Sequence, residues 1–137
     1  MHRGIRWIAI GALTFVAVVV AGACGSDNGD SDGGDTTQNG SMTVKMLDSV
    51  FQPDHLTVKA GTTVKFELPN LGVLPHNMHI ASARGVYRES PWVSQPEPIN
   101  GGKTGSLTWE VPAEAGTYKF RCDYHESTMF GTITVEP

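Results

Sequence analysis

The chain has 137 residues, of which 39% are hydrophobic, and its formal net charge is −4. Its basic residues form no patch and no basic helix, which argues against a nucleic-acid partner. Only about 95 residues have a globular composition, enough for one domain with one modest core.

The N-terminal segment has the organisation of an export signal. Arg3 and Arg6 form a basic start, residues 7–21 are an uncharged apolar run, and small residues precede Cys24. This pattern resembles a bacterial lipoprotein box, so we expect residues 1–23 to be a lipoprotein signal peptide and Cys24 to carry the lipid that anchors the protein to the cell membrane. An ordinary cleaved signal and an uncleaved transmembrane anchor are the alternatives. All three place the rest of the chain outside the cytoplasm, in a periplasm or on the outer surface.

The next segment, residues 24–41, comprises Cys24 and a tether rich in Gly, Asp and Ser. Residues 25–41 include no aromatic or aliphatic side chain. Such a segment cannot bury enough apolar surface to offset the entropy lost on ordering, so we expect it to be disordered. The second cysteine of the chain is Cys122, and a disulfide with Cys24 is the alternative use of the two thiols.

Residues 42–137 are expected to form the folded domain. Short alternating segments, separated by Gly, Pro and Asn, predict strands near residues 43–47, 56–59, 62–68, 76–81, 107–111, 117–122 and 131–135. This pattern is typical of an all-β sandwich or barrel. Residues 82–105 are rich in Pro and Gly, and we expect a long surface loop there, which is uncommon unless it is functional.

Sulfur and imidazole side chains gather between the last two predicted strands. Cys122, His125 and Met129 follow a C-x2-H-x3-M spacing, and His76 lies upstream at another strand. The alternation of the strand that ends at Cys122 puts its thiol on the same face as Phe120, toward the core. Two imidazoles, one thiolate and one distant thioether are the ligand set of a blue-copper electron-transfer site. A zinc site is disfavoured because a thioether is a poor zinc ligand.

These features resemble the cupredoxins of the plastocyanin, pseudoazurin and amicyanin type. The resemblance is carried by the C-x2-H-x3-M segment and the Gly-led strand after it, by Pro-His-Asn at residues 75–77, and by the stretch FQPDHLTVKAGTTVKFELPN. It extends from about Met42 to Pro137. It implies a cupredoxin-like Greek-key β-sandwich with one type 1 copper ion at one end.

The resemblance also implies roles for individual residues. The copper ligands would be His76, Cys122, His125 and Met129. The carbonyl group of Pro75 would lie on the axial side opposite the thioether. The side chain of Asn77 would tie the two ligand segments together, which is the kind of support that orients metal ligands.

The implied function is that of a membrane-anchored electron carrier that cycles between Cu(II) and Cu(I), and not an enzyme. Copper enzymes with this fold need additional His-x-His or His-Cys-His motifs, which the sequence lacks. We expect a monomer whose partners are redox proteins that dock on an apolar surface around His125, formed by Leu71, Val73, Leu74 and Phe130. An extracytoplasmic copper-binding or delivery protein is the alternative, since it would use the same ligands.

Overall fold

The computed structural model describes residues 36–37 and 40–137. The strands are β1 Thr36–Thr37, β2 Ser41–Thr43, β3 Lys45–Met46, β4 Phe51–Gln52, β5 His55–Lys59, β6 Thr63–Pro69, β7 His79–Ile80, β8 Thr104–Glu110, β9 Gly116–Arg121 and β10 Phe130–Glu136. One turn of 3-10 helix, Tyr87–Glu89, lies between β7 and β8. Among these residues, no helix has the length and apolar character needed to cross a membrane.

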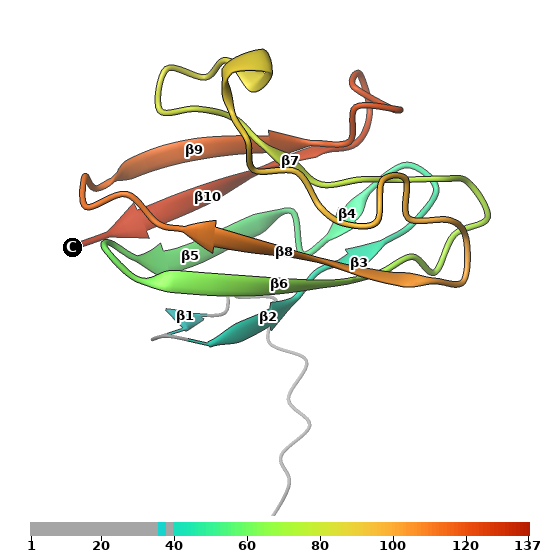
Figure 1. The fold of residues 1–137 in the computed structure, drawn as a ribbon, viewed down its shortest axis with the longest axis horizontal. Coiled ribbons are helices and arrows are strands. Elements are labelled where there is room, and N and C mark those ends of the chain that lie inside the picture. The colour runs from blue at the N-terminus through green and yellow to red at the C-terminus, as the bar shows by residue number, and fades with distance from the viewer. Residues whose placement is uncertain (1–35, 38–39) are drawn as a thin grey trace, which may run out of the picture. The chain divides into compact units, whose positions relative to one another are not determined.

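The strands form the layers of a sandwich (Figure 1). One sheet has the order β1-β5-β10-β9-β7, a second has the order β2-β6-β8, and β3 pairs with β4. β5 runs parallel to β10 and β2 runs parallel to β6, whereas β9 is antiparallel to both of its neighbours. The prediction of an all-β sandwich is therefore confirmed.

The core follows from the alternation of the strands. In β6, Val64, Phe66 and Leu68 are fully buried, and the residues between them face solvent. The antiparallel partner β8 places Leu107 opposite Phe66 and Trp109 opposite Val64. Burying each side chain of this size contributes about 1.5–3 kcal/mol, so these pairs hold the two strands in a single register.

The segment 82–105 is more ordered than the surface loop that the sequence predicted. Its residues form isolated bridges to three other parts of the chain: Val93 to His79, Gln95 to Ser106 and Ile99 to His76. Both Ser94 and Ile99 are fully buried. These contacts could not be predicted from the sequence. Prolines interrupt the segment, and a proline has no N–H to donate to a strand ladder, so the segment shows no strand pattern.

The N-terminal boundary of the folded part also differs from the expected one. Thr36–Thr37 pair in parallel with β5, and Ser41 begins the strand beside β6, although residues 24–41 were expected to be a disordered tether. The physical reason is that the edge of a sheet offers unpaired backbone groups to any neighbouring segment, whatever its hydrophobicity. The predicted signal peptide 1–23 and the predicted lipidation site Cys24 lie outside the described residues.

Candidate metal centre

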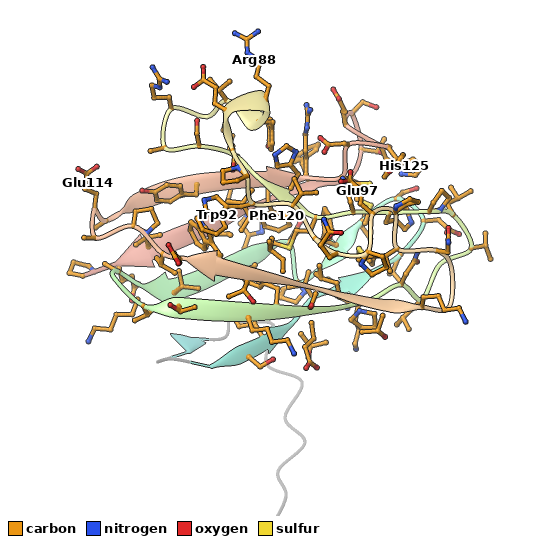
Figure 2. The ribbon with its side chains drawn as sticks, in the orientation of Figure 1. Arg88, Trp92, Glu97, Glu114, Phe120 and His125 are labelled. Carbon is orange, nitrogen blue, oxygen red and sulfur yellow. The ribbon has the colours of Figure 1, made fainter. Side chains whose placement is uncertain are left out.

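Three of the predicted ligand side chains meet at one end of the sandwich. Nδ1 of His76 lies 3.7 Å from Sγ of Cys122, and Nδ1 of His125 lies 3.6 Å from the same sulfur. Donor atoms of the three residues all lie within 4.8 Å of one another. His76 and Cys122 are fully buried, whereas His125 is partly exposed. Figure 2 shows His125 at the end of the sandwich opposite to Glu114.

Cys122 is placed by strand β9 and by the loop that follows it. Tyr118, Phe120 and Cys122 are all buried, as the alternation of the strand predicts. The N–H of Cys122 donates to the carbonyl of Met129 at 2.9 Å, and the N–H of Met129 donates to the carbonyl of His125 at 2.9 Å. These bonds fold residues 122–129 into a compact loop that returns to β10.

His76 is placed by backbone pairing with a distant segment. Its N–H donates to the carbonyl of Ile99 at 3.1 Å, and its carbonyl accepts from the N–H of Ile99 at 2.8 Å. Asn70, which is buried, donates to the carbonyls of Leu74 and Ile99 and accepts from the N–H of Gly72. The turn before His76 and the segment around Ile99 are thus one hydrogen-bonded unit.

Asn77 connects the two segments that carry the ligands. Its Oδ1 accepts the N–H of Asp123 at 2.8 Å, and its Nδ2 donates to Oε1 of Glu97 at 2.8 Å and to Oδ2 of Asp123 at 3.1 Å. Asn77 is fully buried, so no water competes for these bonds. The amide of Asn77 therefore adds a side-chain link between these segments to the backbone pairing of β7 with β9.

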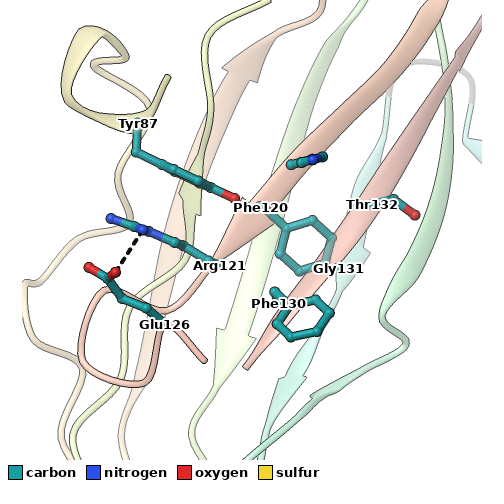
Figure 3. A pocket seen from close by; sticks show the side chains of 8 residues that line it. Tyr87, Phe120, Arg121, Glu126, Phe130, Gly131 and Thr132 are labelled. Carbon is teal, nitrogen blue, oxygen red and sulfur yellow. Dashed lines mark ion pairs between the residues drawn. The ribbon is translucent and has the colours of Figure 1, made fainter. Parts of the chain in front are cut away.

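Asp123 is the centre of an outer layer of charged contacts. Its carboxylate lies 2.7 Å from Nδ1 of His79 and accepts from Nε of Arg121 at 2.8 Å. Arg121 also pairs with Glu126 at 3.0 Å and lies 4.0 Å from the centre of the Tyr87 ring, beside a pocket of about 410 Å³ (Figure 3). These contacts brace the outer side of the 122–129 loop.

The buried position of the site changes the proton affinities of its groups. Burial raises the pKa of the Cys122 thiol, against the opposing effect of backbone hydrogen bonds from Asn77, Tyr124 and His125. Burial, followed by the charge of His125, lowers the pKa of His76. The metal-free site thus favours a neutral thiol and a neutral buried imidazole. Metal binding replaces the thiol proton, which makes metal affinity depend on pH.

The donor set fits a copper ion that changes its oxidation state. Imidazole nitrogen suits copper, and thiolate sulfur favours Cu(I). Nδ1 of the fully buried His76 faces the sulfur of Cys122 at 3.7 Å, and Nε2 of the same ring has no hydrogen-bond partner in the described part of the chain. Met129 is fully buried at the end of the loop, and Pro75 is exposed just before His76. Their roles as axial groups stay predictions.

The residues predicted to form the docking surface are exposed. Val73 exposes 81% of its surface, the largest fraction among the exposed large hydrophobic residues of the described chain, and Leu71, Leu74 and Phe130 are exposed as well. Exposed apolar side chains that gather in a patch mark an interaction site more often than scattered ones do.

Sequence reasoning missed Asp48, Asn70 and Asp123 as parts of the site. Asp123 follows Cys122 directly with the opposite strand parity, so a supporting contact could have been inferred from its position. Asp48 gave no local signal because it bonds to a residue 25 positions away, and the bond of Asn70 to Ile99, 29 positions away, could not be read from the local turn that Asn70 also forms with Gly72 and Leu74.

Comparison with known proteins places this geometry in a family. The model of the cupredoxin-like domain matches residues 12–135. The chain is 40% identical over 91 residues to chloroplastic plastocyanin of Oryza sativa subsp. indica, which covers 63% of this chain and 54% of the rice protein, so it spans about half of that relative. It is 34% identical over 97 residues to amicyanin-alpha of Methylorubrum extorquens, covering 71% of this chain and 73% of that protein.

Solved structures agree on the fold. Reduced auracyanin of Roseiflexus castenholzii superposes with a TM-score of 0.59 at 19% identity, over 73% of this chain and 98% of that one. At this identity the similarity concerns the fold alone. Because the family model matches most of the sequence, residues 12–135, the chain belongs to the cupredoxin-like family.

Proposed function

We propose that this protein is a type 1 blue copper electron-transfer protein, with copper bound by His76, Cys122, His125 and Met129. The observation that carries the proposal is the convergence of two imidazole Nδ1 atoms on one buried cysteine sulfur at the end of the sandwich. The similarity to plastocyanin and amicyanin supports it. Copper bound there supplies a one-electron Cu(II)/Cu(I) couple.

The chain's own contribution is to hold the donor atoms still and to exclude water. His76 is fixed by the bridge to Ile99, and Cys122 by the end of β9 and its bond to Met129. The amide of Asn77, together with the pairing of β7 with β9, holds the two segments to each other. A donor set that both oxidation states tolerate, held by a rigid frame, needs little rearrangement when an electron arrives or leaves.

The proposed contact with redox partners is the apolar surface around His125. Of the three converging side chains, His125 alone reaches solvent, so a protein docked there approaches the donor atoms most closely. Small and weak interfaces are typical of transient electron-transfer complexes. This role requires no catalytic group, and we propose that the protein is a monomeric carrier and not an enzyme.

We also propose that the mature protein is anchored outside the cytoplasm by a lipid on Cys24. The apolar run before Cys24 and the small residues next to it support this assignment. Partitioning of the mature wild-type chain into the detergent phase, and its loss in Cys24→Ala, is the expected result. A mature wild-type chain found wholly in the aqueous phase contradicts the anchor.

The copper site is tested by adding Cu(II) to the metal-free folded domain and recording the visible spectrum. We expect an intense blue thiolate-to-copper band that disappears on reduction and is absent in Cys122→Ser. His55→Ala is the matched control, because His55 is an exposed histidine paired with Asp54. A wild type without the band, or a Cys122→Ser variant that keeps it, contradicts the proposal.

A copper-delivery protein would use the same ligands but must release the metal readily. The full burial of His76 and Cys122 argues against ready release. Exchange of bound Cu(I) with a soluble chelator separates the two functions: an electron carrier retains the metal through many redox cycles, whereas a delivery protein loses it in the reduced state.

A further inference from the structure

The second ring nitrogen of His76, Nε2, makes none of the hydrogen bonds described so far. Nε2 of His76 is completely buried and, among the described residues, is the single buried side-chain nitrogen or oxygen atom without a hydrogen-bond partner. An unsatisfied buried polar atom costs free energy, so a native structure that keeps one needs a reason for it.

The carboxylate of Asp48 lies close to this atom. Oδ1 of Asp48 is 4.0 Å from Nε2 of His76. Asp48 belongs to the turn between β3 and β4, where the N–H of Leu47 donates to the carbonyl of Val50 at 3.0 Å. It therefore reaches the histidine from a different strand pair, and not from the segment that carries the ligand.

The same oxygen is held in place by the turn before His76. Oδ1 of Asp48 accepts the N–H groups of Val73 at 2.7 Å and of Leu74 at 3.1 Å. A Cβ atom at position 72 would collide with this oxygen, so the carboxylate occupies the space that a side chain at Gly72 would fill. The absence of a side chain at Gly72 is thus what admits Asp48 to this position.

The chemistry of an imidazole ligand gives this arrangement a purpose. When Nδ1 of His76 holds a metal, the neutral ring must carry its proton on Nε2. That N–H then needs an acceptor in a buried place, and metal-bound histidines commonly donate it to a carboxylate. Oδ1 of Asp48 lies 4.0 Å from Nε2, which is longer than a hydrogen bond, so the carboxylate and the ring need to approach by about 1 Å for the bond to form.

We propose that Asp48 is a positioning residue for His76. Its carboxylate accepts a hydrogen bond from the Nε2–H group and so fixes the orientation of the ring. The negative charge of the carboxylate also lowers the reduction potential of the site. This inference rests on the proposed copper function. The potential falls because a fixed negative charge near the metal stabilises the more positive oxidation state; solvent weakens the effect, since the Asp48 side chain is 47% exposed.

Four variants separate this role from a purely structural one. Asp48→Asn keeps an oxygen that accepts the N–H groups of Val73 and Leu74 but removes the charge. Asp48→Ala removes both. Gly72→Ala displaces the carboxylate without altering Asp48. Glu114→Gln is the matched control, because it removes one negative charge at the opposite end of the sandwich (Figure 2).

Two measurements on the copper-loaded proteins give the expected results. By electrochemistry, Asp48→Asn and Asp48→Ala raise the reduction potential clearly above that of Glu114→Gln. In the Cu(I) form, nuclear magnetic resonance shows that the ring N–H of His76 exchanges with solvent at least roughly tenfold faster in Asp48→Ala and Gly72→Ala than in the wild type, because the acceptor that protects it is gone.

A third measurement needs no metal. If position 72 acts mainly through the Asp48 carboxylate, Gly72→Ala destabilises the metal-free wild type in denaturant unfolding clearly more than it destabilises Asp48→Ala, where of the atoms nearest to the added Cβ only the backbone nitrogen of residue 48 remains, at 3.0 Å. This is the non-additivity expected of two contacting residues.

Distinct outcomes overturn distinct statements. A wild type that forms no blue band contradicts the proposed function itself. A blue wild type whose Asp48→Asn potential matches that of Glu114→Gln contradicts the proposal for Asp48 alone, and so does an unchanged exchange rate of the His76 ring proton in Asp48→Ala. Equal destabilisation by Gly72→Ala in both backgrounds shows that position 72 does not act through the carboxylate.

Discussion

The two histidines of the site are held in different ways. His76 is fully buried and sits in a backbone bridge to Ile99, with Asn70 tying the turn before it to the same segment. His125 is partly exposed, and the backbone hydrogen bonds of this residue run to near neighbours in the sequence, Cys122, Thr128 and Met129. The position of the buried histidine is thus set by long-range pairing, and that of the exposed histidine by local turns.

This difference suits the two histidines to different roles. A ligand held by remote segments keeps its position as long as the domain is folded, because moving it breaks contacts throughout the core. A ligand held by local turns can be exposed to a partner without loss of the core. The exposed histidine is therefore suited to contact, and the buried one to fixing the geometry.

The largest expected difference between the two sides concerns stability. Asn70→Ala removes two donated hydrogen bonds and one accepted bond in a buried place, and we expect it to lower the free energy of unfolding of the metal-free protein by about 3 kcal/mol. Thr128→Ala, which removes a 3.5 Å contact to the carbonyl of His125 on the exposed loop, should cost less than about 0.5 kcal/mol. Denaturant unfolding measures both, and equal losses would contradict the comparison.

The second prediction concerns the end of the loop. Met129→Gln replaces the proposed soft thioether by an oxygen ligand that favours Cu(II), so we expect copper to stay bound and the reduction potential to fall by on the order of 100 mV, or about 2.3 kcal/mol. Voltammetry of the two proteins measures the shift. The control is Thr128→Ala, on the exposed loop, whose reduction potential should equal that of the wild type. A second methionine, Met78, does not serve as a control because it lies in the core. A potential that stays the same or rises in Met129→Gln places the axial ligand elsewhere.

The third prediction is a pH dependence of the buried side. Burial lowers the pKa of His76 below that of a histidine in the unfolded chain, which is about 6.5. The unfolded chain therefore binds the proton first as the pH falls. The stabilising effect of the neutral ring is fully present above the unfolded pKa and is lost as the pH drops toward the lower folded pKa, with a slope of up to about 1.4 kcal/mol per pH unit.

The measurement is denaturant unfolding of the metal-free protein from about pH 7.5 to about pH 5. His76→Gln should reduce the slope in this window by the contribution of one proton. Thr128→Ala, which removes no titratable group, should leave the slope as it is in the wild type. An undiminished slope in His76→Gln shows that other groups cause the dependence.

The smallest expected effect concerns the docking surface. Val73→Lys adds a charge to the exposed apolar surface, so two copies of the chain should repel one another there. We expect electron self-exchange between the Cu(I) and Cu(II) forms to slow by roughly tenfold, or about 1.4 kcal/mol, with the stability changed by less than about 0.5 kcal/mol. Ala115→Lys adds the same charge next to Glu114, at the other end of the sandwich, and should leave the rate nearly unchanged. Equal slowing by both variants would indicate an effect of net charge and not of this surface.

The sequence alone predicted the elements whose information is local. Alternation in β6, β9 and β10 predicted strands and the inward direction of Phe120 and Cys122, because the side-chain period of a strand is fixed. The spacing of Cys122, His125 and Met129 predicted one compact loop, since few residues separate them. The chemistry of the candidate site followed from residue type, because few ligand sets combine two imidazoles with a thiol and a thioether.

Only the tertiary structure decided which remote residues support the site. Three contacts join segments that are far apart in the sequence, so no local pattern predicts them. They are the bridge between His76 and Ile99, the hydrogen bond from Asn70 to Ile99 and the approach of Asp48 to His76. The space left by Gly72 has a meaning only once the β3–β4 turn lies beside it. The local pattern of a strand determines which way its side chains point. Contacts between strands depend instead on how the sheets pair and pack, and the whole chain determines this pairing because it depends on the total free energy of the folded domain.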